Sequence, residues 1–218
     1  MSRHRWAALA VLATFTLAAC TGGGKAETSA DGQVEDPNAT ASSAPAAAAA
    51  AAAKSFQDLS KALQIAVPDG YVRQPDEVGD TGASNLDKAV SDDGGDDARE
   101  VLTRTRFLRG YQRMWSRGED DEIIAYVYQF ADNAGALEYT QRLTADSGAQ
   151  TAGVSIALFD VPAINGAVGV NGSDPTFATS SVTFVKGPYS VQMVVNGASP
   201  TGLETLATAL AEEQYSRL

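Results

Sequence analysis

Residues 123–130 read IIAYVYQF, and this stretch decides the fold of the chain. Branched and aromatic side chains make up most of it, and such side chains pack well on the pleated surface of a sheet. We therefore predict a β-strand here. A strand leaves backbone N–H and C=O groups unpaired unless another strand lies beside it, so the flanking sequence must supply a neighbour.

The preceding residues, 106–117, are the expected neighbour, although their pattern fits two structures. If they form a strand, one face carries alternate residues, namely Phe107, Arg109, Tyr111, Arg113, Trp115 and Arg117. If they form a helix, an apolar stripe runs through Leu108, Tyr111 and Trp115. Gly110 would cost about 1 kcal/mol inside a helix, and residues 117–121 have the length of a hairpin loop. We predict a hairpin.

Helical patterns with capping residues lie on both sides of this hairpin. Before it they cover residues 55–63, 85–91 and 98–105; after it they cover 132–147, with Leu137, Thr140 and Leu143 facing inward, and 199–210, with Ser199 as the cap. Further strands are predicted at 154–159, 182–186 and 189–196, and the glycine-rich residues 162–172 are predicted to form a loop with bulges.

Together these elements predict an α+β domain, in which an antiparallel sheet of hairpins has helices packed on one face. The order strand, turn, strand, capped helix occurs over residues 109–143 and again over 182–210. The two segments share few residues. We therefore predict two strand-strand-helix pseudo-repeats that share the order of their elements but not their sequence.

The N-terminal region predicts export. Two arginines near the start, an apolar run over residues 6–17 and small residues after it form a secretory signal. The run is too short to span a bilayer, which needs about 20 apolar residues. Residues 17–20, LAAC, resemble a bacterial lipobox. We expect a signal peptide at 1–19 and a diacylated Cys20, for instance carrying palmitate.

A tether and one domain are expected after Cys20. Residues 20–54 are rich in Ala, Gly, Ser and Pro, and such a segment buries too little apolar surface to order itself, so we predict a disordered tether. The alanine run over 46–54 is ambiguous, because it could extend the next helix backwards. Residues 55–218 are enough for a single domain with a real core.

Composition excludes several kinds of chemistry and partner. The formal net charge is −11, and loss of Arg3 and Arg5 with the signal takes it to −13. An acidic body is repelled by nucleic acid, so we expect no nucleic-acid partner. The only histidine, His4, leaves with the signal, and the only thiol, Cys20, is acylated. Serine–histidine catalysis, cysteine catalysis and zinc held by these residues are therefore excluded, and no cofactor is expected.

Two groups of residues are candidates for ligand binding. The cluster Arg99, Arg104, Arg106, Arg109, Arg113 and Arg117 could grip a small anion with Tyr111 and Trp115 stacking nearby. The favoured alternative is structural: these arginines pair with the acids of 92–97 and 119–122 and cover aromatic surface. Tyr126, Tyr128 and Phe130 share a face of the strand and could form a ligand-stacking wall, although core packing is the more ordinary role. Residues 92–97, DDGGDD, are predicted to be a solvated acidic loop, since they lack the spacing of a calcium site.

Part of the sequence resembles a known group of proteins. The segments are FLRGY at 107–111 with Trp115, VYQFAD at 127–132 with Ala136 and Tyr139, and VTFVKGPY at 182–189. With the lipobox and tether, they resemble uncharacterised actinobacterial, mycobacterial-type envelope lipoproteins. This resemblance implies a location on the extracytoplasmic side of the cell membrane. The general shape resembles Mog1/PsbP-type domains by analogy of fold only.

Three classes of function fit these features. We favour a non-catalytic binding or interaction module, anchored in the lipid bilayer through Cys20, that meets an envelope protein or a small anionic ligand. A hydrolase of wall polymers based on two carboxylates is the alternative. A solute-binding receptor is the third, although the domain is small for two lobes. The protein is accordingly not expected to be an enzyme.

Overall fold

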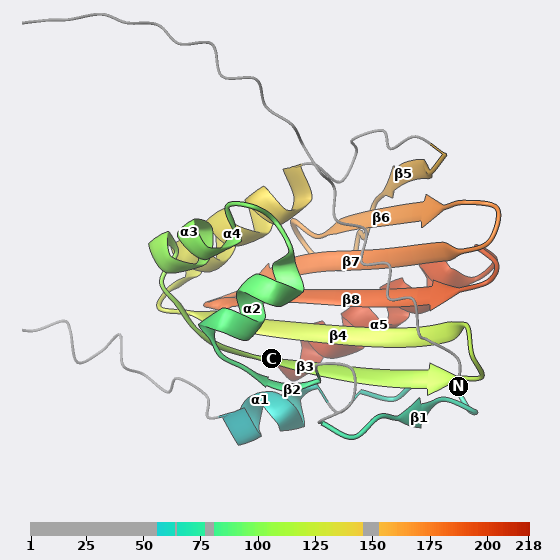
Figure 1. Ribbon diagram of the computed structural model, residues 1–218, viewed down its shortest axis with the longest axis horizontal. Helices are drawn as coiled ribbons and strands as arrows, with labels where there is room; N and C mark the ends of the chain where they lie inside the picture. The colour runs from blue at the N-terminus through green and yellow to red at the C-terminus, as the bar shows by residue number, and fades with distance from the viewer. Residues whose placement is uncertain (1–55, 64, 77–80, 146–152) are drawn as a thin grey trace, which may run out of the picture.

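A computed structural model describes residues 56–63, 65–76, 81–145 and 153–218. The predictions for the signal peptide at 1–19, for Cys20, for the tether at 20–54 and for a helical extension through 46–54 lie outside these residues. So does the predicted end of the fourth helix near Ser147. The described chain forms one antiparallel sheet with helices against it (Figure 1).

The predicted hairpin is confirmed and lies in the sheet interior. Strand β3 (Phe107–Arg117) pairs with β4 (Asp121–Phe130) in antiparallel register, with Trp115 opposite Ile123 and Tyr111 opposite Val127. The helical alternative for 106–117 is therefore wrong. Gly110 lies against the ring of Tyr128, where a Cβ would overlap that ring, so this close approach requires glycine.

The remaining strands extend the sheet in both directions. Beyond β4 come β8 (Tyr189–Gly197), β7 (Ala178–Lys186), β6 (Val168–Ser173) and β5 (Ser155–Phe159); beyond β3 lie β1 (Val72–Arg73) and β2 (Gly82–Ser84), which both pair with it. The predicted strands at 154–159, 182–186 and 189–196 are thus confirmed. The predicted loop at 162–172 is partly wrong, because valines at 168 and 170 alternate as in a strand and form β6.

Helices cover both faces of the sheet, which corrects the prediction that they pack on one face. Helices α1 (Phe56–Ala62) and α5 (Leu203–Arg217) lie on one face, called the α5 face. Helices α2 (Leu86–Asp93), α3 (Ala98–Arg104) and α4 (Asn133–Ala145) lie on the other, called the α4 face. Figure 1 shows α2, α3 and α4 in front of the strands and α5 behind them. The predicted α+β class is confirmed.

Each face has its own core. On the α5 face, Ile123, Ala125 and Val127 are fully buried beneath Leu210 and its neighbours in α5. On the α4 face, Phe130 and Tyr139 stack at a centroid distance of 5.2 Å. Alternate residues of a strand point to opposite faces, so β4 supplies both cores, which explains why residues 123–128 of this strand are apolar or aromatic on both faces.

The two predicted pseudo-repeats share their order but not their geometry. Strands β4 and β8 are antiparallel neighbours, so a two-fold axis perpendicular to the sheet, between these strands, would relate the β3–β4 hairpin to the β7–β8 hairpin. Such an axis keeps each helix on the same face. Helix α4 follows β4 onto one face, whereas α5 follows β8 onto the other. The repeat is therefore limited to element order.

Helix α4 has two of its three predicted inward residues as expected, since Thr140 is buried and Leu143 packs partly buried against the core, but Leu137 is not one of them. Leu137 is 44% exposed, and the buried residues are Gly135, Ala136, Tyr139 and Thr140. The helix starts so close to the end of α3 that a Cβ on Gly135 would overlap the carbonyl oxygen of Thr105. Small residues on this turn permit the approach and rotate Leu137 outward. Helix α5 begins at Leu203, after Gly202, and so one turn later than the predicted cap at Ser199.

Candidate functional site

The sheet separates the predicted site residues into two groups. Arg109, Tyr111, Arg113 and Trp115 project to the α5 face, because they lie opposite Gln129, Val127, Ala125 and Ile123. Tyr126 and Tyr128 project to the α4 face, opposite Gln112 and Gly110. The six side chains therefore line no common cavity, and each group has its own partners.

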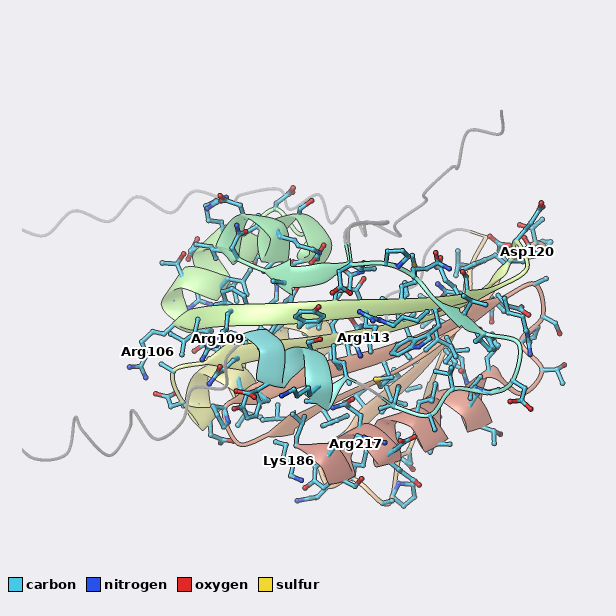
Figure 2. The ribbon with its side chains drawn as sticks, turned by 90° about the horizontal axis from the view of Figure 1, so that it is seen from below. Arg106, Arg109, Arg113, Asp120, Lys186 and Arg217 are labelled. Atoms are coloured by element: carbon cyan, nitrogen blue, oxygen red, sulfur yellow. The ribbon has the colours of Figure 1, made fainter. Side chains whose placement is uncertain are left out.

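The arginine cluster is dispersed and mostly paired, although its partners differ from the predicted ones. Arg99 pairs with Asp87, Arg104 with Glu100 and Glu138, Arg106 with Asp132, and Arg117 with Asp121. Among these ion pairs of the described residues, that of Arg117 with Asp121 is the one that involves an acid of the predicted segments. Arg109 donates to Gln129 Oε1 at 2.9 Å. In Figure 2, Arg106 and Arg109 lie towards one end of the domain and Arg113 lies near its middle.

Arg113 is the most unusual member of this cluster. Its side chain lies between β3 and α1 and is only 2% exposed. Its Nη2 donates to Ser60 Oγ at 2.7 Å, while its buried Nε has no hydrogen-bond partner. Burial lowers the pKa of Arg113, and the like charge of Arg73 lowers it further. The guanidinium is thus held in the interior at an energetic cost that its hydrogen bond to Ser60 does not fully offset.

Asp76 supplies a negative charge that partly compensates the positive charge of buried Arg113. It accepts hydrogen bonds from the hydroxyl of Tyr111 and from Arg73. These hydrogen bonds, with attraction from Arg73 and Arg113, outweigh desolvation and lower the pKa of Asp76. The carboxylate is therefore ionised at neutral pH and already engaged, so it stabilises the buried arginine rather than offering a free catalytic acid.

Tyr126 and Tyr128 belong to a polar network beneath α2. Gln112 connects them to Lys88, because its amide donates to the hydroxyl of Tyr126 at 3.3 Å and its carbonyl accepts from Lys88 at 2.7 Å. Lys88 also forms an ion pair with Asp92 at 2.7 Å, and the hydroxyl of Tyr128 donates to Asp92 at 3.2 Å. The predicted stacking wall is therefore part of the packed, hydrogen-bonded interior.

Asp93 forms a second buried ion pair beside the first. Its carboxylate is fully buried and accepts two bonds from Arg142 Nη1, at 2.7 and 2.9 Å, and one from the hydroxyl of Tyr139 at 3.0 Å. Helix α2 begins with Asn85, whose side chain accepts from the backbone N–H of Lys88, and continues through Asp93. The prediction that 92–97 is wholly a solvated loop is therefore wrong for its first two residues.

The two buried tyrosines should give the protein a distinct alkaline titration. Burial raises the pKa of Tyr128 and Tyr139 well above the ordinary value of about 10, and the nearby carboxylates of Asp92 and Asp93 raise it further. A raised folded-state pKa contributes stability that is present below about pH 10 and is lost as the pH rises further. We expect both to stay protonated until the fold opens, as followed by tyrosinate absorbance. Tyr128→Phe/Tyr139→Phe should remove this late phase; an unchanged titration curve would contradict the assignment.

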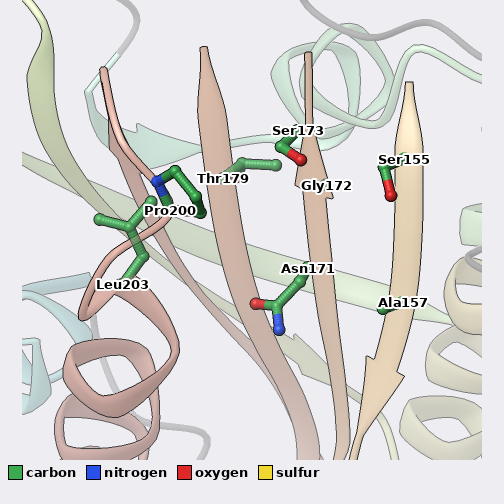
Figure 3. A pocket seen from close by; sticks show the side chains of 8 residues that line it. All are labelled: Ser155, Ala157, Asn171, Gly172, Ser173, Thr179, Pro200 and Leu203. Atoms are coloured by element: carbon green, nitrogen blue, oxygen red, sulfur yellow. The ribbon is translucent and has the colours of Figure 1, made fainter. Parts of the chain in front are cut away.

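A hollow that sequence reasoning missed lies near the edge of the sheet formed by β5, away from β1 and β2 (Figure 3). It measures about 140 Å³, and its lining comes from β5, β6, β7 and the start of α5: Ser155, Ala157, Asn171, Gly172, Ser173, Thr179, Pro200 and Leu203. These side chains are uncharged, and most of them are small. No motif marks them in the sequence, because they come from four elements and meet only in the folded sheet.

Two further features bear on chemistry and location. Within the described residues, no group of three or more His, Cys, Asp or Glu side chains is placed to hold a metal ion. No helix in the described part of the chain is long and apolar enough to cross a membrane.

Comparison of the sequence with models of protein families finds no match, and comparison with curated proteins finds none either. Among solved structures, the fold is similar to the extracellular domain of PknH from Mycobacterium tuberculosis, with a TM-score of 0.44 and 10% identity. The similarity covers 76% of this chain and 93% of that domain. At this level it assigns no function.

Proposed function

We propose that the protein is a lipid-anchored, extracytoplasmic module of the cell envelope that binds other molecules without catalysis. The observation that carries this proposal is the LAAC motif at residues 17–20, directly after an apolar run and a basic start. The cysteine would carry the lipid, and residues 21–54 would hold the domain away from the bilayer. The resemblance to actinobacterial envelope lipoproteins is part of the same proposal.

The state of the buried carboxylates supports binding over hydrolysis. A hydrolase of this kind needs two carboxyl groups facing each other across the scissile bond, with one protonated as a general acid. Asp92 is paired with Lys88, and Asp93 is paired with Arg142. Both are at the end of α2, and their side chains are 8% and 0% exposed, so a polymer has little access to them. They therefore act as structural anions.

The size of the hollow beside β5 favours a surface for interaction at this place over a solute pocket. Small-molecule sites usually measure about 300–1,000 Å³, and interfaces between domains are among their preferred places. The hollow measures about 140 Å³ and lies on a single sheet, beside its edge strand β5. It is suited to receiving a part of a partner at the surface.

The lipid anchor is tested by replacing the cysteine. We expect the wild-type chain to incorporate labelled palmitate, to be shortened by signal cleavage and to fractionate with membranes. Cys20→Ala should lose the label and remain uncleaved, because the acylation and the cleavage that depends on it both need the thiol. Thr21→Ala, next to the motif, should behave as wild type. If Cys20→Ala is labelled and cleaved like the parent, the lipid-anchor proposal is wrong.

A further inference from the structure

The two edges of the sheet differ in how they are protected against pairing with another chain. At one edge, β1 and β2 have only two and three residues, Arg73 lies in β1, and Pro75 follows it. Short strands, charge and proline are the usual devices that prevent edge-to-edge pairing. At the other edge, β5 pairs only with β6 within the described residues and carries none of these devices.

Strand β5 is also unusual in composition. Its five residues, Ser155–Phe159, are uncharged in a chain whose net charge is −11. Leu158 is 60% exposed, although it is a large apolar residue, and Ile156 is half-buried on the same face. Among the described residues no second strand pairs with β5, and an edge strand of this kind with an exposed leucine is a template for strand addition.

We propose that β5 pairs with β5 of a second copy of this chain, in antiparallel register about a two-fold axis at Ala157. This register places Ala157 opposite Ala157, and Ile156 opposite Leu158, on both sides of the axis. The exposed leucine of each copy is then covered by the isoleucine of the other. The same strand serves as both donor and acceptor surface, as a two-fold interface requires.

Electrostatics is consistent with a second copy in this register. The nearest acid in sequence is Asp160, just beyond the end of β5. In the paired register the two Asp160 residues are offset by six positions, or about 20 Å at the rise of a strand. This exceeds the Debye length of about 8 Å at physiological ionic strength. Two acidic molecules can therefore meet along β5 with little repulsion between these acids.

The pairing is expected to be weak. Five residues on each side bury less surface than the roughly 1,200–2,000 Å² of a standard stable interface. The complex should exchange rapidly, and its detection calls for covalent trapping at the axis. Opposed residues in an antiparallel pair have Cα atoms about 4.5–5.5 Å apart, within the range that a disulfide spans.

The decisive test is cross-linking of the full chain in membranes of the expressing cells. Ala157→Cys should form a disulfide-linked dimer under mild oxidation. Ser155→Cys is the matched control, since it lies on the same strand and face but about 14 Å from its counterpart in this register. We expect at least about tenfold more dimer at 157 than at 155. Equal cross-linking at both positions, or none at 157, would overturn the proposal.

A charge exchange tests the register itself in the Ala157→Cys background. Ile156→Lys/Leu158→Lys places lysine opposite lysine at both pairs and should abolish the dimer, because like charges directly opposite repel. Ile156→Lys/Leu158→Glu places lysine opposite glutamate and should retain it. Both variants alter exposed or half-buried residues of an edge strand, so their unfolding midpoints should agree. A charge-paired variant that cross-links no better than the lysine variant would refute the two-fold register.

This proposal is independent of the lipid anchor. The wild-type chain contains one thiol, at Cys20, and serves as the background control. If Cys20 is acylated, the wild type gives no disulfide dimer. If the anchor proposal fails and Cys20 is free, the wild type itself forms disulfide-linked dimers. The yields of dimer from Ala157→Cys and Ser155→Cys are then compared in a Cys20→Ala background, which still tests the pairing of β5.

Discussion

Asp93→Ala is expected to lower the free energy of unfolding by about 3–5 kcal/mol, as for removal of one partner of a buried ion pair. The carboxylate is fully buried, and its loss leaves the hydroxyl of Tyr139 without its acceptor. Arg142 would keep only Asp97, which is half exposed. Helices α2 and α4 are joined through this carboxylate, so the change should loosen both from the sheet.

Two matched variants show whether the effect belongs to the buried charge. Asp93→Asn keeps the size of the side chain and one acceptor oxygen, so its loss should be smaller than that of alanine. Asp96→Ala changes an exposed acid of the same acidic stretch and should stay within about 0.5 kcal/mol of wild type. Denaturant unfolding measures all three. An Asp93→Ala protein as stable as Asp96→Ala would show that the ion pair makes no net contribution.

The longer strands of this fold were predictable because their sequences carry strong local signals, whereas β2 and β6 were not predicted. The apolar run at 123–130 and the hairpin signal before it were enough to place β3 and β4. The face of the sheet on which each helix packs was not predictable. A strand that is apolar on both sides, as β4 is, gives no indication of which face a following helix will cover. The assignment depends on contacts such as that of Gly135 with Thr105, which are distant in sequence.

The candidate site was less predictable than the fold. Alternation along β3 correctly grouped Arg109, Tyr111, Arg113 and Trp115 on one face, but the shift in register before Arg109 puts Phe107, predicted on the same face, on the other. The burial of Asp92 and Asp93 was hidden, because a run of acids and glycines is usually a solvated loop and the neutralising Arg142 lies about fifty residues away. The hollow beside β5 could not be predicted for a similar reason, because its lining residues come from four elements and share no sequence pattern.

Substitution of Arg113 is expected to give the second large change in stability. Alanine and methionine at this position separate the contribution of side-chain packing from that of the buried charge. Arg113→Ala should lower the free energy of unfolding by about 2–4 kcal/mol, since truncation of a large buried side chain leaves a cavity. Arg113→Met keeps most of the stem and removes the desolvated charge. We expect it to match or exceed the stability of wild type, as replacement of buried charges by apolar groups often does. Arg106→Ala, on the exposed end of the cluster, should have little effect.

The same pair of proteins separates a structural arginine from an anion-binding one. If Arg113 is structural, sulfate at matched ionic strength should raise the unfolding midpoints of wild type and Arg113→Met equally, because sulfate stabilises folded proteins by exclusion from their surface. If a bound anion completes the coordination of the free Nε, wild type should gain more than the methionine variant. We expect equal gains, because Arg113 is almost inaccessible and Asp76 already supplies a nearby negative charge. A sulfate response confined to wild type would instead make the space between β3 and α1 the anion site.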